Sequence, residues 1–255
     1  MNRFKWLVFI LCLSVFIARG ELILFIGDSI TDGNWGSPNK YPCSSSERNL
    51  WDKNHILGHG YPEMTAGYFM GNFPDKDYQF LNRGISGETL FQIADRWEKD
   101  AMQYSPDIIS LLCGTNDVHY WLEKNPDNLE EFDFNRYRIE LDSLVRYTLD
   151  KNPQIRFVLC TPFVAKAGSV GSDSNFELRK AAVDSIAKIT REIASSFHEK
   201  ISLVDFNSLL DELLIEKPSP EYWMWDGIHP TTAMHYRMSK LWIEKAPEPG
   251  SLKRD

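Results

Sequence analysis

Near-continuous apolar runs recur along the chain, and the gaps between them are long enough for a helix. Apolar runs without polar alternation are typical of strands in a parallel sheet covered on both faces. We therefore expect five buried strands. Their predicted bounds are 22–26, 78–81, 107–112, 155–159 and 201–204.

Two segments between the later strands repeat apolar residues at helical spacing. One face carries Tyr137, Leu141, Leu144, Val145 and Thr148, and the other carries Ala182, Ile186, Ile189, Ile193 and Phe197. Alternating strands and helices indicate an α/β fold with a parallel sheet. Connections of this kind are right-handed, which predicts a three-layer α/β/α sandwich.

Three segments have the composition of loops or tails. Residues 33–60 are rich in Asn, Ser, Gly and Pro, and residues 166–175 read KAGSVGSDSN. Long loops in compact domains are often functional. Residues 246–255 are expected to form a loose tail.

The first 20 residues have the pattern of a secretory signal peptide. Arg3 and Lys5 precede an apolar run over 6–18, and Ala18 and Gly20 supply the small residues of a cleavage site. The run is short for a membrane span, which needs about 20 residues. We expect a secreted or periplasmic protein with one domain over 21–245 and no membrane insertion after cleavage. Lipoprotein anchoring through Cys12 is the less favoured alternative.

Composition narrows the classes of partner. The chain of 255 residues is 43% hydrophobic and 25% charged, as a folded domain should be, and its net charge is -8. Without a basic stripe, binding to nucleic acid is not expected. No clustered His/Cys spacing suggests a metal, and no cofactor is expected. Cys43, Cys113 and Cys160 are interpreted as small buried hydrophobes or, being an odd number, as including a free thiol.

Polar blocks follow the first three predicted strands, and a fourth lies near the C-terminus. They are Gly27-Asp-Ser-Ile-Thr31, Asn82-Arg-Gly-Ile-Ser-Gly87, Gly114-Thr-Asn-Asp117 and Asp226-Gly-Ile-His-Pro230. In an open parallel sheet, ligands bind beyond the carboxyl ends of the strands, so these blocks should converge.

Taken together and in this order, the four blocks resemble the SGNH (GDSL-like) hydrolase family. The resemblance covers nearly all of the chain after the leader. It implies a flavodoxin-like three-layer sandwich with a five-stranded parallel sheet, and a serine esterase that needs no metal.

The resemblance also implies roles for individual residues. Ser29 is the nucleophile, His229 the general base, and Asp226 the acid that orients the His229 ring. The Ser29 and Gly84 backbone N–H groups, with the Asn116 amide, form the oxyanion hole. Each residue also has a plainer interpretation. Ser29 could cap a helix, Asn116 could belong to a turn, and His229 could be an ordinary surface histidine.

Aromatic residues give the only indication of the substrate. Trp35, Trp121, Trp223 and Trp225 lie on segments expected near the site, and flat rings stack well on sugars. We therefore expect hydrolysis of small acyl esters, above all acetyl esters, on carbohydrates. A lysophospholipase or thioesterase with the same triad is an alternative. An inactive carbohydrate-binding protein is an alternative from another class.

Overall fold

The computed structural model describes residues 20–35, 42–48, 55–126 and 131–247. Almost all of the predicted leader, including Cys12, and residues 248–255 of the predicted tail lie outside the described residues. Within the described residues, no helix is both long and apolar enough to cross a membrane.

The predicted sheet is confirmed. Its strands are β1 (Leu22–Gly27), β2 (Gln79–Asn82), β3 (Ile108–Leu112), β4 (Arg156–Cys160) and β5 (Ile201–Val204). All neighbours pair in parallel, in the order β2-β1-β3-β4-β5. Each strand begins and ends within one or two residues of its predicted bounds, because its apolar run is bounded by polar residues.

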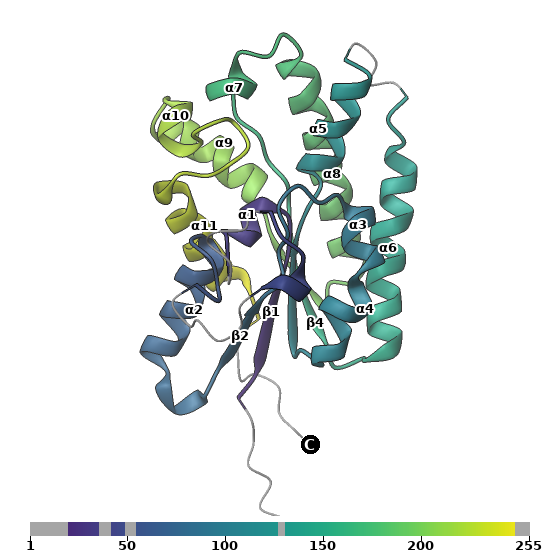
Figure 1. Ribbon diagram of the computed structural model, residues 1–255, viewed down its shortest axis with the longest axis vertical. Coiled ribbons are helices and arrows are strands. Elements are labelled where there is room, and N and C mark those ends of the chain that lie inside the picture. The colour runs from purple at the N-terminus through teal and green to yellow at the C-terminus, as the bar shows by residue number, and fades with distance from the viewer. Residues whose placement is uncertain (1–19, 36–41, 49–54, 127–130, 248–255) are drawn as a thin grey trace, which may run out of the picture.

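Helices cover both faces of the sheet (Figure 1). Those with α-helical geometry are α1 (Ser29–Asp32), α2 (Tyr61–Asn72), α3 (Leu90–Asp95), α4 (Trp97–Asp100), α5 (Thr115–Lys124), α6 (Phe134–Lys151), α7 (Gly168–Gly171), α8 (Phe176–Ser196), α9 (Phe206–Glu216), α10 (Pro220–Trp223) and α11 (Thr232–Lys245). Short 3₁₀ turns span Ser45–Glu47, Pro74–Lys76 and Met102–Tyr104. The two predicted helices are α6 and α8.

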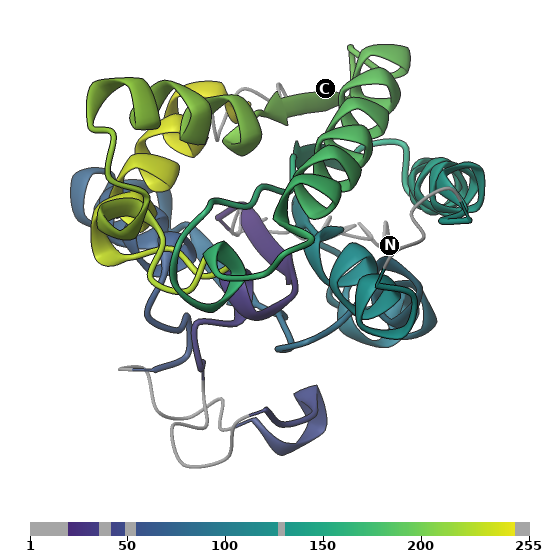
Figure 2. The same ribbon diagram turned by 90° about the horizontal axis from the view of Figure 1, so that it is seen from above.

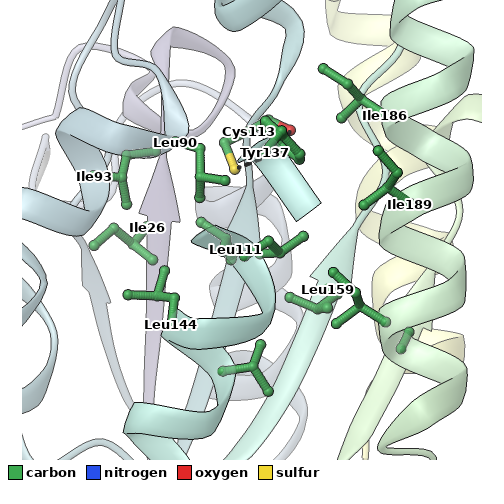
Figure 3. Packing of buried hydrophobic residues seen from close by; sticks show 14 of the residues in the cluster. Ile26, Leu90, Ile93, Leu111, Cys113, Tyr137, Leu144, Leu159, Ile186 and Ile189 are labelled. Carbon is green, nitrogen blue, oxygen red and sulfur yellow. Dashed lines mark hydrogen bonds between the residues drawn. The ribbon is translucent and has the colours of Figure 1, made fainter. Parts of the chain in front are cut away.

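Alternate residues of the strands feed two separate cores. In β1, Leu24 and Ile26 face the core shared with α3, α6 and α8, while Ile23 and Phe25 face the core shared with α2, α9 and α11. Figure 3 shows Ile26 and Leu111 of the sheet beside Leu144 of α6. Burial on both faces explains why the strands are continuously apolar.

The order of the strands places a crevice at the end of β1. From β1 the chain crosses to β2 on one side, and then to β3 on the other side. At such a switch point the connections leave in opposite directions, and the space between them is the usual ligand site of an open α/β sheet. Figure 2, which looks onto this end of the molecule, shows β1 near the middle.

Candidate active site

Ser29 stands at the switch point, as the first residue of α1 directly after β1. Asp28 occupies the N-cap position, where its Oδ1 accepts a hydrogen bond from the Ile30 N–H at 3.0 Å. Ser29 is therefore not the cap of this helix. The cap leaves its hydroxyl available for another partner.

A hydrogen-bonded chain connects Ser29 to His229 and Asp226. The His229 Nε2 lies 2.8 Å from the Ser29 Oγ, although His229 comes 200 residues later in the chain. On the other side of the ring, Nδ1 lies 2.6 Å from the Asp226 Oδ2. With the ring proton on Nδ1 and donated to the Asp226 carboxylate, the Nε2 lone pair can accept the serine proton.

The loop that carries Asp226 and His229 is closed by its own hydrogen bonds. The Asp226 Oδ1 accepts from the backbone N–H of Ile228 at 2.9 Å and of His229 at 2.7 Å. Met224 and Pro230 form an antiparallel bridge across the loop. These contacts fix the acid and the base relative to each other.

The electrostatics of the pair favour a charged Asp226 and a basic His229. Burial acts to raise the pKa of Asp226, but hydrogen bonds from the His229 ring and from two backbone N–H groups outweigh it and lower the pKa. Burial likewise acts to lower the pKa of His229, and the hydrogen bond and charge of Asp226 outweigh it and raise the pKa. A raised pKa makes the ring a stronger proton acceptor.

Asp28 is a second carboxyl group near the base, and it is only 2% exposed. Burial raises its pKa to about 7, against the opposing effects of the Ile30 N–H and the charge of His229. Its carboxylate accepts the capping hydrogen bond from the Ile30 N–H, which gives it a structural role in the turn.

Asn116 lies in the first turn of α5, at the same end of the sheet as Ser29. Its Nδ2 donates to the Glu88 carbonyl oxygen at 3.1 Å, which holds the side chain and leaves its second amide hydrogen for another acceptor.

The predicted role of Gly84 conflicts with its hydrogen bonding. The Gly84 N–H donates to the Asn82 Oδ1 at 2.9 Å, so this donor is already occupied. Gly87 lies three residues further on, in the same loop, and has a positive φ of 83°. Among the described residues, no protein acceptor takes the Gly87 N–H. The sequence motif contains both glycines, and only the backbone conformation distinguishes them.

Two of the four predicted substrate tryptophans are buried, and the prediction is wrong for them. Trp35 is 0% exposed, and its Nε1 donates to the Gly84 carbonyl oxygen at 2.8 Å. Trp223 is 4% exposed and donates to the Lys217 carbonyl oxygen. Both rings anchor their segments to the body of the protein, a use of tryptophan that composition cannot distinguish from substrate contact.

The other two tryptophans, Trp121 and Trp225, are more exposed than Trp35 and Trp223. Trp225 is 64% exposed, and its ring stacks on His229 with centroids 5.9 Å apart. Trp121 is half-buried, with its edge against the Phe132 ring. With Tyr120 it lines a cavity of about 280 Å³.

Other candidate groups have structural partners. The three cysteines in the described part of the chain are buried and form no disulfide. The ring Nδ1 of His235 accepts from the Tyr61 N–H, and burial lowers its pKa to about 4. In the described part of the chain, no group of three or more His, Cys, Asp or Glu residues could hold a metal ion.

Comparisons with known proteins identify the family of this chain. The model of the GDSL-like Lipase/Acylhydrolase family matches residues 25–237. An acetylxylan esterase of Geobacillus stearothermophilus is 28% identical over 232 residues, which cover 90% of this chain and 95% of the esterase.

Solved structures show the same similarity. The crystal structure of a GDSL-like lipase from Parabacteroides merdae superimposes with a TM-score of 0.73 at 30% identity, covering 89% of this chain and 95% of that one. An acetyl xylan esterase from Geobacillus stearothermophilus gives 0.69 at 27% identity, covering 89% and 94%. Catalytic mutants of that esterase alter a serine, an aspartate and a histidine, the last two being three residues apart. This chain belongs to the GDSL-like lipase/acylhydrolase family and is an ester hydrolase.

Proposed function

We propose that the protein removes acetyl groups from carbohydrate esters through an acyl-enzyme at Ser29. The observation that carries this proposal is the continuous chain of hydrogen bonds from the Ser29 Oγ through His229 to Asp226. The acetylxylan esterase, at 28% identity over most of both chains, supports the acetyl substrate.

The triad geometry supports a two-step reaction. In the first step the His229 Nε2 takes the Ser29 proton while the Oγ attacks the ester carbonyl carbon. The same ring then returns the proton to the departing sugar hydroxyl. In the second step His229 activates a water molecule, which releases acetate and frees Ser29. Asp226 remains ionised and stabilises the His229 imidazolium in both steps.

The tetrahedral intermediate needs hydrogen-bond donors at its oxyanion. We assign the Ser29 backbone N–H and the second amide hydrogen of Asn116 to this role. Gly87, whose N–H has no acceptor among the described residues, supports the role better than Gly84 does. A single such donor is worth about 3–4 kcal/mol in the transition state.

Trp225 is the feature of the site that favours a sugar substrate. Its exposed ring lies directly beside the catalytic histidine, where the alcohol part of the ester would leave. A flat aromatic surface in this place suits the apolar face of a pyranose ring. The predicted secretory leader over 1–20 and the hydrolase domain over 21–245 also fit a substrate outside the cell.

Release of acetate from acetylated xylan or xylooligosaccharides tests this function. The wild-type protein should release acetate, and Ser29→Ala should lower kcat by about four orders of magnitude or more with unchanged thermal unfolding. Ser208→Ala, on α9 and outside the triad, is the matched control and should remain active. Hydrolysis of long-chain p-nitrophenyl esters without acetate release would favour a lipid esterase or thioesterase instead. Failure to react with a fluorophosphonate probe would favour the inactive binding protein.

A further inference from the structure

His119 lies one helical turn after Asn116 on α5. Residues three apart on a helix share a face, and their side chains lean toward the helix N-terminus. His119 therefore lies on the same face of α5 as Asn116. It is partly accessible, with 27% of its side chain exposed.

Arg179 of α8 fixes the tautomer of the His119 ring. The Arg179 Nη1 lies 2.9 Å from the His119 Nδ1. A guanidinium has donors only and stays protonated, so Nδ1 must be the acceptor. The ring proton then stands on Nε2, on the outward side of the ring.

The charges around the ring come from three other segments besides α8. Glu123 of α5 lies 3.3 Å from Nε2, Asp173 accepts from the Arg179 Nη2 at 2.9 Å, and the Asp226 carboxylate acts from the triad loop. Burial and the Arg179 charge lower the pKa of His119, against the opposing effect of the three carboxylates. His119 is thus held neutral at physiological pH.

His119, Arg179 and Asp173 are connected to the triad loop through α7. The Val170 N–H donates to the Asp226 carbonyl oxygen at 3.1 Å, and the Asp173 N–H donates to the Val170 carbonyl oxygen at 3.2 Å. Figure 1 shows α7 and α5 at the same end of the molecule, above α1. His119 is thereby connected to the loop of Asp226 through Arg179, Asp173 and Val170. Its own helix, α5, carries Asn116.

We propose that His119 is a substrate-positioning residue whose Nε2–H donates a hydrogen bond to a hydroxyl or ring oxygen of the bound sugar. This inference rests on the proposed carbohydrate substrate. A neutral donor suits a sugar oxygen, which carries no charge to attract a cation. The Glu123 carboxylate would compete with the sugar for the His119 Nε2–H. The Glu123 side chain is 57% exposed, so solvent weakens its interaction with the ring.

Kinetics on two substrates, one with a sugar and one without, distinguish a substrate-positioning role of His119 from a purely structural one. His119→Leu should raise KM for acetylated xylooligosaccharides by about threefold to tenfold, the effect of one lost neutral hydrogen bond. The same variant should impair p-nitrophenyl acetate hydrolysis less than hydrolysis of the sugar ester, because that substrate has no sugar oxygen to bind.

Arg179→Met gives a second signature that depends on pH. Without the guanidinium the neutral ring populates both tautomers, so KM for the sugar ester should rise at pH 8. Below about pH 6.5 the freed ring becomes protonated, and both nitrogens then carry a proton. The defect in KM should therefore shrink at low pH in Arg179→Met but not in His119→Leu. Arg191→Met, on the same helix and with its own ion pair to Asp205, should show neither effect.

The possible outcomes distinguish this inference from the proposed function. A wild-type protein that releases no acetate from xylooligosaccharides contradicts both. An active wild type overturns the role of His119 alone, if His119→Leu leaves KM for the sugar ester unchanged or weakens both substrates equally. A defect in Arg179→Met that does not depend on pH overturns the assigned tautomer.

Discussion

Asp226 accepts three hydrogen bonds with one carboxylate, from the His229 ring and from the N–H groups of Ile228 and His229. The two backbone bonds hold the carboxylate in place, and the ring bond holds the imidazole. At the scale of the residue, this side chain therefore determines both the orientation and the basicity of His229.

Replacing Asp226 by asparagine should change both rate and pH dependence. We expect kcat for Asp226→Asn to fall by about 10⁴, because the amide favours the wrong tautomer of His229. In the wild type, kcat/KM should decline as the pH falls through the raised pKa of His229, above 6.5, because the base must be neutral. Removing the charge that raises this pKa should move the acid limb of the profile to lower pH.

Asp142→Asn, at an exposed ion pair on α6, is the matched control and should leave the pH profile of kcat/KM unchanged. An acid limb that stays in place in Asp226→Asn would contradict the assigned role of the carboxylate.

A residue's role can be predicted from the sequence when its type has few uses, and not when its type has many. Asp226 and His229 could be proposed as a pair because a carboxylate and an imidazole three residues apart have few joint uses. Trp35 and Trp223 were misinterpreted because tryptophan serves equally well as an anchor, and burial depends on contacts far along the chain. Gly84 and Gly87 differ in backbone conformation, which the motif does not encode.

At the scale of the element, α7 supports the triad loop. Its first residue, Gly168, has a φ of 51°, and a Cβ atom there would lie 2.6 Å from the Asp226 Cα. The helix thus packs directly against the backbone that positions the acid. The sequence predicted only a loop over 166–175, because four residues of KAGSVGSDSN carry no helical periodicity and the contact with Asp226 is long-range.

Gly168→Ala should therefore impair catalysis through the loop. The added methyl group must displace the Asp226 backbone, so we expect kcat to fall about tenfold to a hundredfold, with the misplacement of the base as the cause. Assays on p-nitrophenyl acetate would measure this loss. Gly67→Ala is the control, because its Cβ atom would meet nothing within 4 Å and should stabilise α2 slightly. Full activity in Gly168→Ala would show that α7 does not constrain the triad.

At the scale of the whole molecule, the sheet separates two cores and holds the site at one of its ends. The apolar runs predicted the strands closely because residues buried on both faces leave a continuous signal. The pairing order β2-β1-β3-β4-β5 did not follow from those runs, since every strand has similar composition. That order creates the switch point at Ser29.

Substitution within one core should destabilise the entire fold. Phe157 of β4 is 0% exposed and stacks on Trp97, with centroids 6.3 Å apart. Phe157→Ala should lower the free energy of unfolding by about 3–5 kcal/mol through the cavity it leaves. Ile215→Ala, at a position 83% exposed, should change it by less than about 0.5 kcal/mol. Denaturant unfolding measures both, and equal effects would contradict the division into core and surface.

The bridge between Met224 and Pro230 has a consequence for how the triad can fail. It closes the short loop that carries Asp226 and His229, so the acid and the base are held together by contacts within one loop. Ser29 belongs to a different segment, the turn after β1. The contact between the Ser29 Oγ and the His229 Nε2 thus joins two segments that lie 200 residues apart, whereas the contact between His229 and Asp226 lies within one loop. We therefore expect a disturbance of the fold to lengthen the contact between the Ser29 Oγ and the His229 Nε2 before it separates His229 from Asp226.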